Sequence, residues 1–176
     1  MFIINWIHRL AWLIREAAFL LSLAGGVVLV GSMLTVLADI AARTLFGMTL
    51  GAINLTFRGS YEIVRYGLLL SILYALPYAL KDGQVIVELF TERLPERIKY
   101  WISGFYILFF GLFGFILTSG LLNSIERAAR SGQTTQDLGI PMAYIYWLAM
   151  VGTVMLGIRG FSVAWEYFTG TETESS

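Results

Sequence analysis

The sequence has no cysteine, a single histidine and only three prolines, and the first two of these shortages each exclude a class of protein. Without cysteine there is no disulfide scaffold, no thiol–disulfide chemistry, no iron–sulfur cluster and no cysteine-ligated metal. With His8 alone, a haem held between two histidines is excluded. Lys plus Arg and Asp plus Glu number 12 each, so the net charge is zero and no basic surface for nucleic acid is expected.

Charge is also scarce overall. Charged residues make up 14% of the chain and hydrophobic residues 57%, whereas soluble domains have about 25% charged and roughly 45–50% apolar residues. Four runs carry no charge at all, namely residues 17–38, 66–80, 100–125 and 138–158. Three of them exceed the roughly 20 residues that a helix needs to cross a membrane.

The second run is too short to span unless it extends back through Arg65 and Glu62 to about Tyr61. With that extension, the sequence predicts an all-α membrane protein with four transmembrane helices, because lipid forces backbone groups to bond within the segment. The predicted spans are about 17–38, 61–80, 100–125 and 139–160, in a single domain over residues 1–176.

Two segments outside the predicted spans have helical patterns of their own. Residues 2–15 place their apolar side chains on one face, which indicates either an N-terminal interfacial helix or an extension of the first span. In the loop between the second and third spans, residues 85–90 indicate a short amphipathic helix on the membrane surface. Pro95 followed by Glu96 is typical of a helix start.

The distribution of basic residues predicts the orientation. Seven lie on the side of the two termini and five on the other side. Since positive charge is retained in the cytoplasm, both termini are expected to be cytoplasmic in a multi-pass inner-membrane protein.

Ionisable residues at membrane depth are the candidate functional groups. Asp39 and Arg43 are four residues apart at the end of the first span, and Glu62 and Arg65 are three apart at the start of the second. Each spacing places an acid and a base on one helical face. Two interpretations stay open: structural salt bridges at the interface, or contacts to another protein or an ion path. We predict a shared polar cluster of these four residues that joins the two helix ends.

The sequence contains no other recognisable catalytic or ligand-binding motif. No Glu-x-x-His motif, histidine cluster or phosphate-binding glycine loop is found, so we expect neither an enzyme, a cofactor nor a metal site. Small residues at packing spacing are frequent, with Ser22 and Gly26, Gly120 and Ser124, and the pair Gly111 and Gly114. Such surfaces let helices approach closely, within this chain or against a second membrane protein.

Several motifs together resemble the small membrane subunit (DctQ-like, or Q subunit) of tripartite ATP-independent periplasmic (TRAP) transporters. Besides the Asp39 and Arg43 pair and the stretch 59–62, the motifs lie in the two loops. The inner-loop motif comprises Lys81, Asp82, Gly83, Gln84, Glu88 and Pro95, and the outer-loop motif comprises Gly132, Thr134, Pro141 and Tyr144. The resemblance covers residues 17–160, although the family commonly has His at position 84 and Asp at position 88.

The resemblance implies a scaffold subunit. Its expected partners are a large multi-spanning permease subunit, a periplasmic substrate-binding protein reached through the complex, and membrane lipids, with no nucleic acid. The expected process is sodium-coupled secondary uptake of an organic anion. The alternatives are a structural subunit of another membrane complex, or a small self-sufficient exporter. The exporter needs an acid deep in the first helix, and residues 20–36 contain none.

Overall fold

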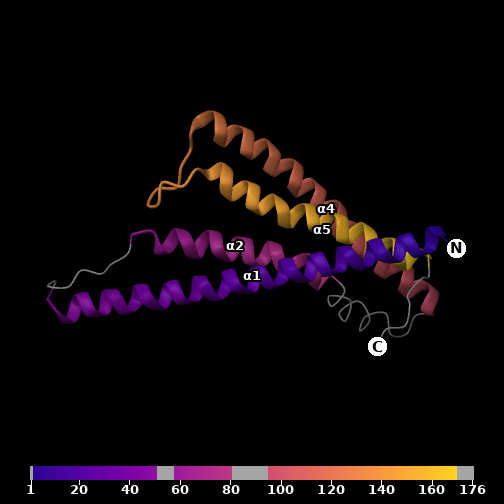
Figure 1. The fold of residues 1–176 in the computed structure, drawn as a ribbon, viewed down its shortest axis with the longest axis horizontal. Helices are drawn as coiled ribbons and strands as arrows, with labels where there is room; N and C mark the ends of the chain where they lie inside the picture. The colour runs from indigo at the N-terminus through magenta and orange to yellow at the C-terminus, as the bar shows by residue number, and fades with distance from the viewer. Residues whose placement is uncertain (1, 51–57, 81–94, 170–176) are drawn as a thin grey trace.

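The computed structural model describes residues 2–50, 58–80 and 95–169, and these form four long helices. In chain order they are α1 (Phe2–Met48), α2 (Ser60–Ala79), α4 (Glu96–Ser131) and α5 (Met142–Thr169). Successive helices run in opposite directions (Figure 1). The start of α1 and the end of α5 therefore lie at one end of the molecule, and the loop between α4 and α5 lies at the other end.

Helix α1 is a single helix of 47 residues, about 70 Å long. The separate interfacial helix predicted for residues 2–15 is not confirmed, because this segment continues into the apolar part of α1 as the other interpretation requires. The physical reason is that no proline or glycine occurs before Gly25 to interrupt the helix. At its other end α1 continues past the predicted limit at residue 38 and projects beyond the start of α2 (Figure 1).

Three helical segments of the described chain are long and apolar enough to cross a membrane: Ala11–Met48, Ile98–Ser131 and Met142–Phe168. Helix α2 has 20 residues but is not among them. The charged residues Glu62 and Arg65 lie within it and lower its mean hydropathy. The regular secondary structure of the described residues is therefore helical, with three segments that can span a membrane by length and composition, and a fourth crossing by α2 stays a prediction.

The helices pack in two antiparallel pairs, and glycine lies where the two helices of each pair approach most closely. Between α1 and α2, a Cβ placed on Gly25 would lie 2.9 Å from the carbonyl oxygen of Ser71. Between α4 and α5, Gly111 faces Gly160, and a Cβ on Gly114 would lie 2.7 Å from the nitrogen of Gly157. The predicted close packing at Gly111 and Gly114 is therefore confirmed within this chain.

The other two predicted small-residue surfaces are open. No atom of the described residues lies within 4 Å of a Cβ added at Gly26 or at Gly120. These glycines therefore do not mediate packing among the described helices.

Helix α5 is the central element of the bundle. It contacts α4 along its length, and also α2 and α1. Half of its apolar segment is buried, whereas most of the apolar surface of α1 and α4 is exposed. Tyr74 of α2 donates a hydrogen bond to the carbonyl oxygen of Leu148 at 3.0 Å, and Gly152 packs against the backbone of Leu73. The buried residues Ile107, Val163, Ala164 and Tyr167 form a core cluster between α4 and α5.

The predicted start of α4 agrees with the structure, whereas the helix runs past the predicted limit at residue 125 to Ser131. Pro95 has an extended backbone and precedes the first residue of α4, as predicted. Gly132 ends α4 in the left-handed conformation, and its N–H donates to the carbonyl oxygen of Ala128. The predicted amphipathic helix at 85–90 lies outside the described residues.

Candidate functional site

The loop between α4 and α5, residues 132–141, folds back on itself at the end of the molecule opposite to the N-terminus. Thr134 and Pro141 pair as an isolated antiparallel bridge. The N–H of Thr135 donates to the carbonyl oxygen of Ile140 at 2.9 Å, and that of Met142 donates to Gln133 at 2.9 Å. The buried Thr135 side chain also accepts the N–H of Ile140 at 3.1 Å. These bonds give the loop a defined shape.

Glu62 of α2 binds the backbone of this loop. Its Oε1 accepts the N–H groups of Gln136 at 2.6 Å and Asp137 at 3.0 Å, and its Oε2 accepts that of Leu138 at 3.0 Å. Glu62 is buried. Three hydrogen bonds to an ionised acceptor are stronger than neutral ones, so they compensate for the loss of hydration of the carboxylate. We call this arrangement the Glu62 clamp; it connects the α1/α2 pair to the α4/α5 pair.

Gly59 allows the loop to approach the start of α2. Its backbone has φ of +102°, a region that residues with a side chain rarely adopt. A Cβ at this position would also lie 2.7 Å from Cδ2 of Leu138, the residue whose N–H reaches Glu62. The 59–62 motif and the outer-loop motif are therefore two sides of one contact.

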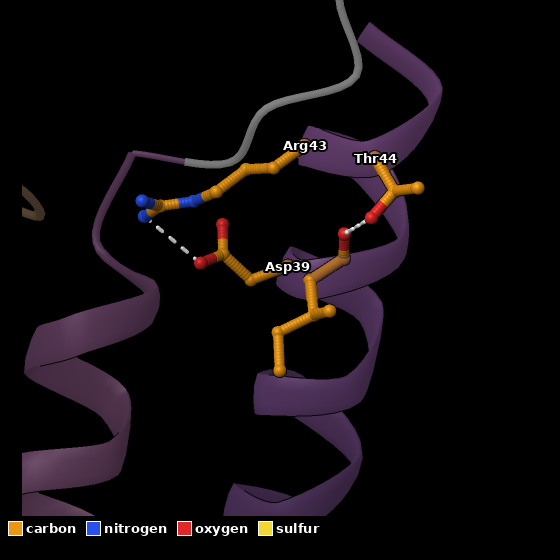
Figure 2. Close-up of polar contacts among 4 residues, drawn as sticks. Asp39, Arg43 and Thr44 are labelled. Carbon is orange, nitrogen blue, oxygen red and sulfur yellow. Dashed lines mark hydrogen bonds and ion pairs between the residues drawn. The ribbon is translucent and has the colours of Figure 1, made fainter. Parts of the chain in front are cut away.

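Asp39 and Arg43 form the ion pair that their spacing predicts. Oδ2 of Asp39 lies 2.9 Å from Nη2 of Arg43, and the two groups face each other on one side of α1 (Figure 2). Arg43 is largely exposed, whereas the Asp39 side chain is 14% exposed. The other carboxylate oxygen of Asp39, Oδ1, is buried and accepts no hydrogen bond from the described residues. Within the described ranges, one acceptor of the pair is thus left without a donor.

Glu62 and Arg65 do not form the pair predicted from their spacing. Among the described residues Glu62 is bound by the loop backbone, and the Arg65 guanidinium lies 5.6 Å from the centre of the Tyr66 ring. A carboxylate already held by three fixed N–H donors gains little from a flexible arginine one turn away. In the described part of the chain, no hydrogen bond or ion pair joins Asp39 or Arg43 to Glu62 or Arg65, so the shared cluster stays a prediction.

The remaining predicted site residues fall into two groups. In the outer-loop motif, Gly132 ends α4, Thr134 and Pro141 pair with each other, and the exposed Tyr144 lies in the first turn of α5 with its N–H bonded to Pro141. In the inner-loop motif, only Pro95 belongs to the described residues. Lys81, Asp82, Gly83, Gln84 and Glu88 lie outside them.

Sequence reasoning missed two features of the site. The first is that backbone N–H groups of the loop bind Glu62, which no side-chain pattern indicates. The second is the burial of Arg159, one of the seven basic residues assigned to the side of the termini, which lies within α5 and is 4% exposed. The sequence did contain a sign of this burial, because position 159 falls within the predicted span 139–160. In the described part of the chain, no group of three or more His, Asp or Glu residues is placed to hold a metal ion.

The comparison with protein families identifies the chain. Residues 32–170 match the family model described as "Tripartite ATP-independent periplasmic transporters, DctQ component". The chain belongs to the DctQ family. Membership assigns it to the small membrane component of TRAP transporters, a transporter part that works with a large permease and a binding protein. Comparisons with curated proteins and with solved structures gave no match.

The match includes the residues of the Glu62 clamp and the Asp39–Arg43 pair, and it begins within α1. Residues 2–31, the first two thirds of α1, precede the matched region. The resemblance found from the motifs is therefore confirmed. Family membership also favours a transporter subunit over a small self-sufficient exporter.

Proposed function

We propose that this DctQ subunit is a rigid scaffold that braces the large permease subunit during sodium-coupled uptake of an organic anion delivered by a periplasmic binding protein. The observation that carries the proposal is the Glu62 clamp, in which three hydrogen bonds fix the α4–α5 loop to the start of α2. A brace needs its helices held in one arrangement, and the clamp joins the two helix pairs at the end where they diverge (Figure 1).

Polar side chains within the apolar helices support the same role. Ser32 donates to the carbonyl oxygen of Val28 at 2.9 Å, and Thr118 donates to the Thr153 hydroxyl at 2.9 Å. Thr153 in turn donates to the carbonyl oxygen of Met150 at 3.1 Å. These hydroxyls are used in helix and interhelix bonds, which stabilise a fixed bundle.

The exposed surfaces favour a membrane partner. The apolar sides of α1 and α4 are mostly uncovered, and the open glycines Gly26 and Gly120 would allow a neighbouring helix to approach closely. We place the protein in the bacterial inner membrane with both termini in the cytoplasm and α2 as the fourth crossing. This orientation rests on the excess of basic residues on the side of the termini, which is six against five when the buried Arg159 is left out.

Reconstitution tests the scaffold assignment. The purified chain in vesicles with an inward sodium gradient is expected to give no uptake of organic anions above that of empty vesicles. The same chain with the large permease subunit and the binding protein should give sodium-dependent uptake. Uptake by the chain alone would contradict the proposal.

The Asp39–Arg43 pair leads to a prediction on assembly. Arg43→Ala leaves the Asp39 carboxylate without its cation, and burying an unpaired charge costs several kcal/mol. We expect a lower yield of the complex with the large subunit, measured by co-purification. Asp39→Asn combined with Arg43→Ala should restore part of the yield. If Arg43→Ala leaves assembly intact and changes only the sodium dependence of uptake, the pair belongs to an ion path instead.

A further inference from the structure

The end of α1 packs against no other described helix. Figure 1 shows α1 continuing beyond the start of α2 and beyond the α4–α5 loop. We call residues 44–50, which form this end, the α1 tip. Residues 43–48 are exposed without exception, so no face of the helix is covered there. The apolar side chains of the α1 tip are Leu45, Phe46, Met48 and Leu50, and the last two are 77% and 97% exposed. Clustered exposed apolar side chains are typical of a contact surface.

Helix α1 is too long for lipid to cover its whole apolar part. The segment Ala11–Met48 has 38 residues, which is about 57 Å at a rise of about 1.5 Å per residue. The hydrocarbon of a bilayer is about 30 Å thick, and transmembrane helices tilt by up to about 40°. A crossing therefore uses at most about 39 Å of helix, or roughly 26 residues. At least about 12 residues of this apolar segment lie outside the hydrocarbon.

The tryptophans indicate that the excess lies at the α1 tip. Three exposed tryptophans lie at the same end of α1, α4 and α5: Trp12, Trp101 and Trp165. Tryptophan is enriched at the level of lipid headgroups. Counted from Trp12, a crossing of roughly 26 residues ends near residue 38. The Asp39–Arg43 pair follows directly and holds the first charges after Glu16. The α1 tip, beyond this pair, therefore lies in the water.

The charges at this end of the α1/α2 pair favour an acidic partner. The last turns of α1 and the first turns of α2 carry three arginines and two acids. Both acids are engaged, since Asp39 lies 2.9 Å from Arg43 and Glu62 binds the loop backbone. Arg58 and Arg65 are exposed, and no acid of the described residues forms an ion pair with either. The uncompensated charge is positive and attracts a surface of the opposite sign.

We propose that the α1 tip docks in an apolar pocket with an acidic rim on the soluble substrate-binding protein of the transporter. A soluble protein reaches the α1 tip from the water. Four apolar side chains make a small contact, and small interfaces are typical of transient complexes, as a protein that delivers substrate and departs requires. A lasting contact with the large subunit has the exposed apolar sides of α1 and α4 available within the membrane. The inference rests on the proposed function and orientation.

Single cysteines test the location and the partner, because the chain contains no cysteine of its own. Leu50→Cys should react with a membrane-impermeant maleimide added from the periplasmic side, both in the chain alone and in its complex with the large subunit. Added purified binding protein should slow this reaction at least tenfold. Gly26→Cys is the control, since Gly26 lies midway along the apolar part of α1 and no described atom is within 4 Å of its added Cβ. It should not react.

The affinity of the binding protein for the complex tests the acidic rim. Leu50→Asp should weaken binding at least tenfold, and Leu50→Lys should weaken it less, because an acidic rim repels only the aspartate. Ile140→Asp is the matched control, since Ile140 is also an exposed apolar residue at this end of the molecule but belongs to the α4–α5 loop. Its affinity should equal that of the unchanged complex.

Four results would overturn the proposal. Absence of reaction at Leu50→Cys in the chain alone would place the α1 tip in the membrane. Protection by the large subunit without the binding protein would assign the tip to that subunit. Equal affinity of Leu50→Asp and the unchanged complex would show that docking occurs elsewhere, and weaker binding by Leu50→Lys than by Leu50→Asp would contradict the acidic rim. None of these results concerns uptake by the chain alone, which is the separate test of the scaffold role.

Discussion

Gly160→Ala is expected to destabilise the bundle by about 1–3 kcal/mol, because the added methyl group meets backbone rather than a side chain that can rotate away. Its Cβ would collide with the Cα of Gly111 on α4 and lie 2.7 Å from the Gly111 nitrogen. Relief requires α4 and α5 to move apart, which also loosens the core between Ile107 and Val163. The effect can be measured as the free energy of unfolding in detergent or bicelles.

Gly120→Ala is the matched control for this substitution. Gly120 lies in the same helix as Gly111, but nothing lies within 4 Å of its added Cβ. The control should be as stable as the unchanged chain, or more stable by up to about 1 kcal/mol through the helix preference of alanine. Equal stability of Gly160→Ala and Gly120→Ala would contradict the close approach of α4 and α5.

Glu62→Gln is expected to release the α4–α5 loop. Glutamine has one acceptor oxygen, and its NH2 group would face an N–H of the loop, donor against donor. The charge-assisted bonds to Gln136, Asp137 and Leu138 would be weakened or lost. We expect hydrogen exchange of these three amides to rise by roughly tenfold or more, and complex formation with the large subunit to fall.

Glu126→Gln controls for the loss of one acid near the same loop. Glu126 is largely exposed and pairs with Arg130 one turn later in α4, and exposed pairs of this kind contribute little to stability. Exchange at residues 136–138 should stay as in the unchanged chain. Protection of these amides that survives Glu62→Gln would show that the internal bonds of the loop, such as Thr135 to Ile140, suffice without the clamp.

Local features were predictable from the sequence because they depend on neighbours along the chain. The apolar runs predicted the helices α1, α4 and α5, and Pro95 followed by Glu96 marked the start of α4. A separation of four residues was enough to predict the Asp39–Arg43 pair. The order of short motifs also sufficed to recognise the family to which residues 32–170 belong.

Contacts between distant segments were decided by the tertiary structure alone. Glu62 and Gln136 are 74 residues apart, and every residue except proline offers the backbone N–H that binds the carboxylate. Spacing along the helix therefore offered Arg65 as a partner for Glu62, with a contact to another protein or an ion path as the alternative. Only the return of the α4–α5 loop to the start of α2 places the three stronger donors beside the acid.

The same reasoning applies to the glycines and to Arg159. Spacing alone predicted helix packing at Gly26, Gly111 and Gly120 alike. Of these three glycines, only Gly111 contacts another of the described helices. A count of charges assigned Arg159 to the side of the termini, whereas in the assembled bundle it is 4% exposed. The sequence determines which segments are helical and apolar. Which face of each helix is covered depends on how all four pack together, since burial is a property of the assembled bundle.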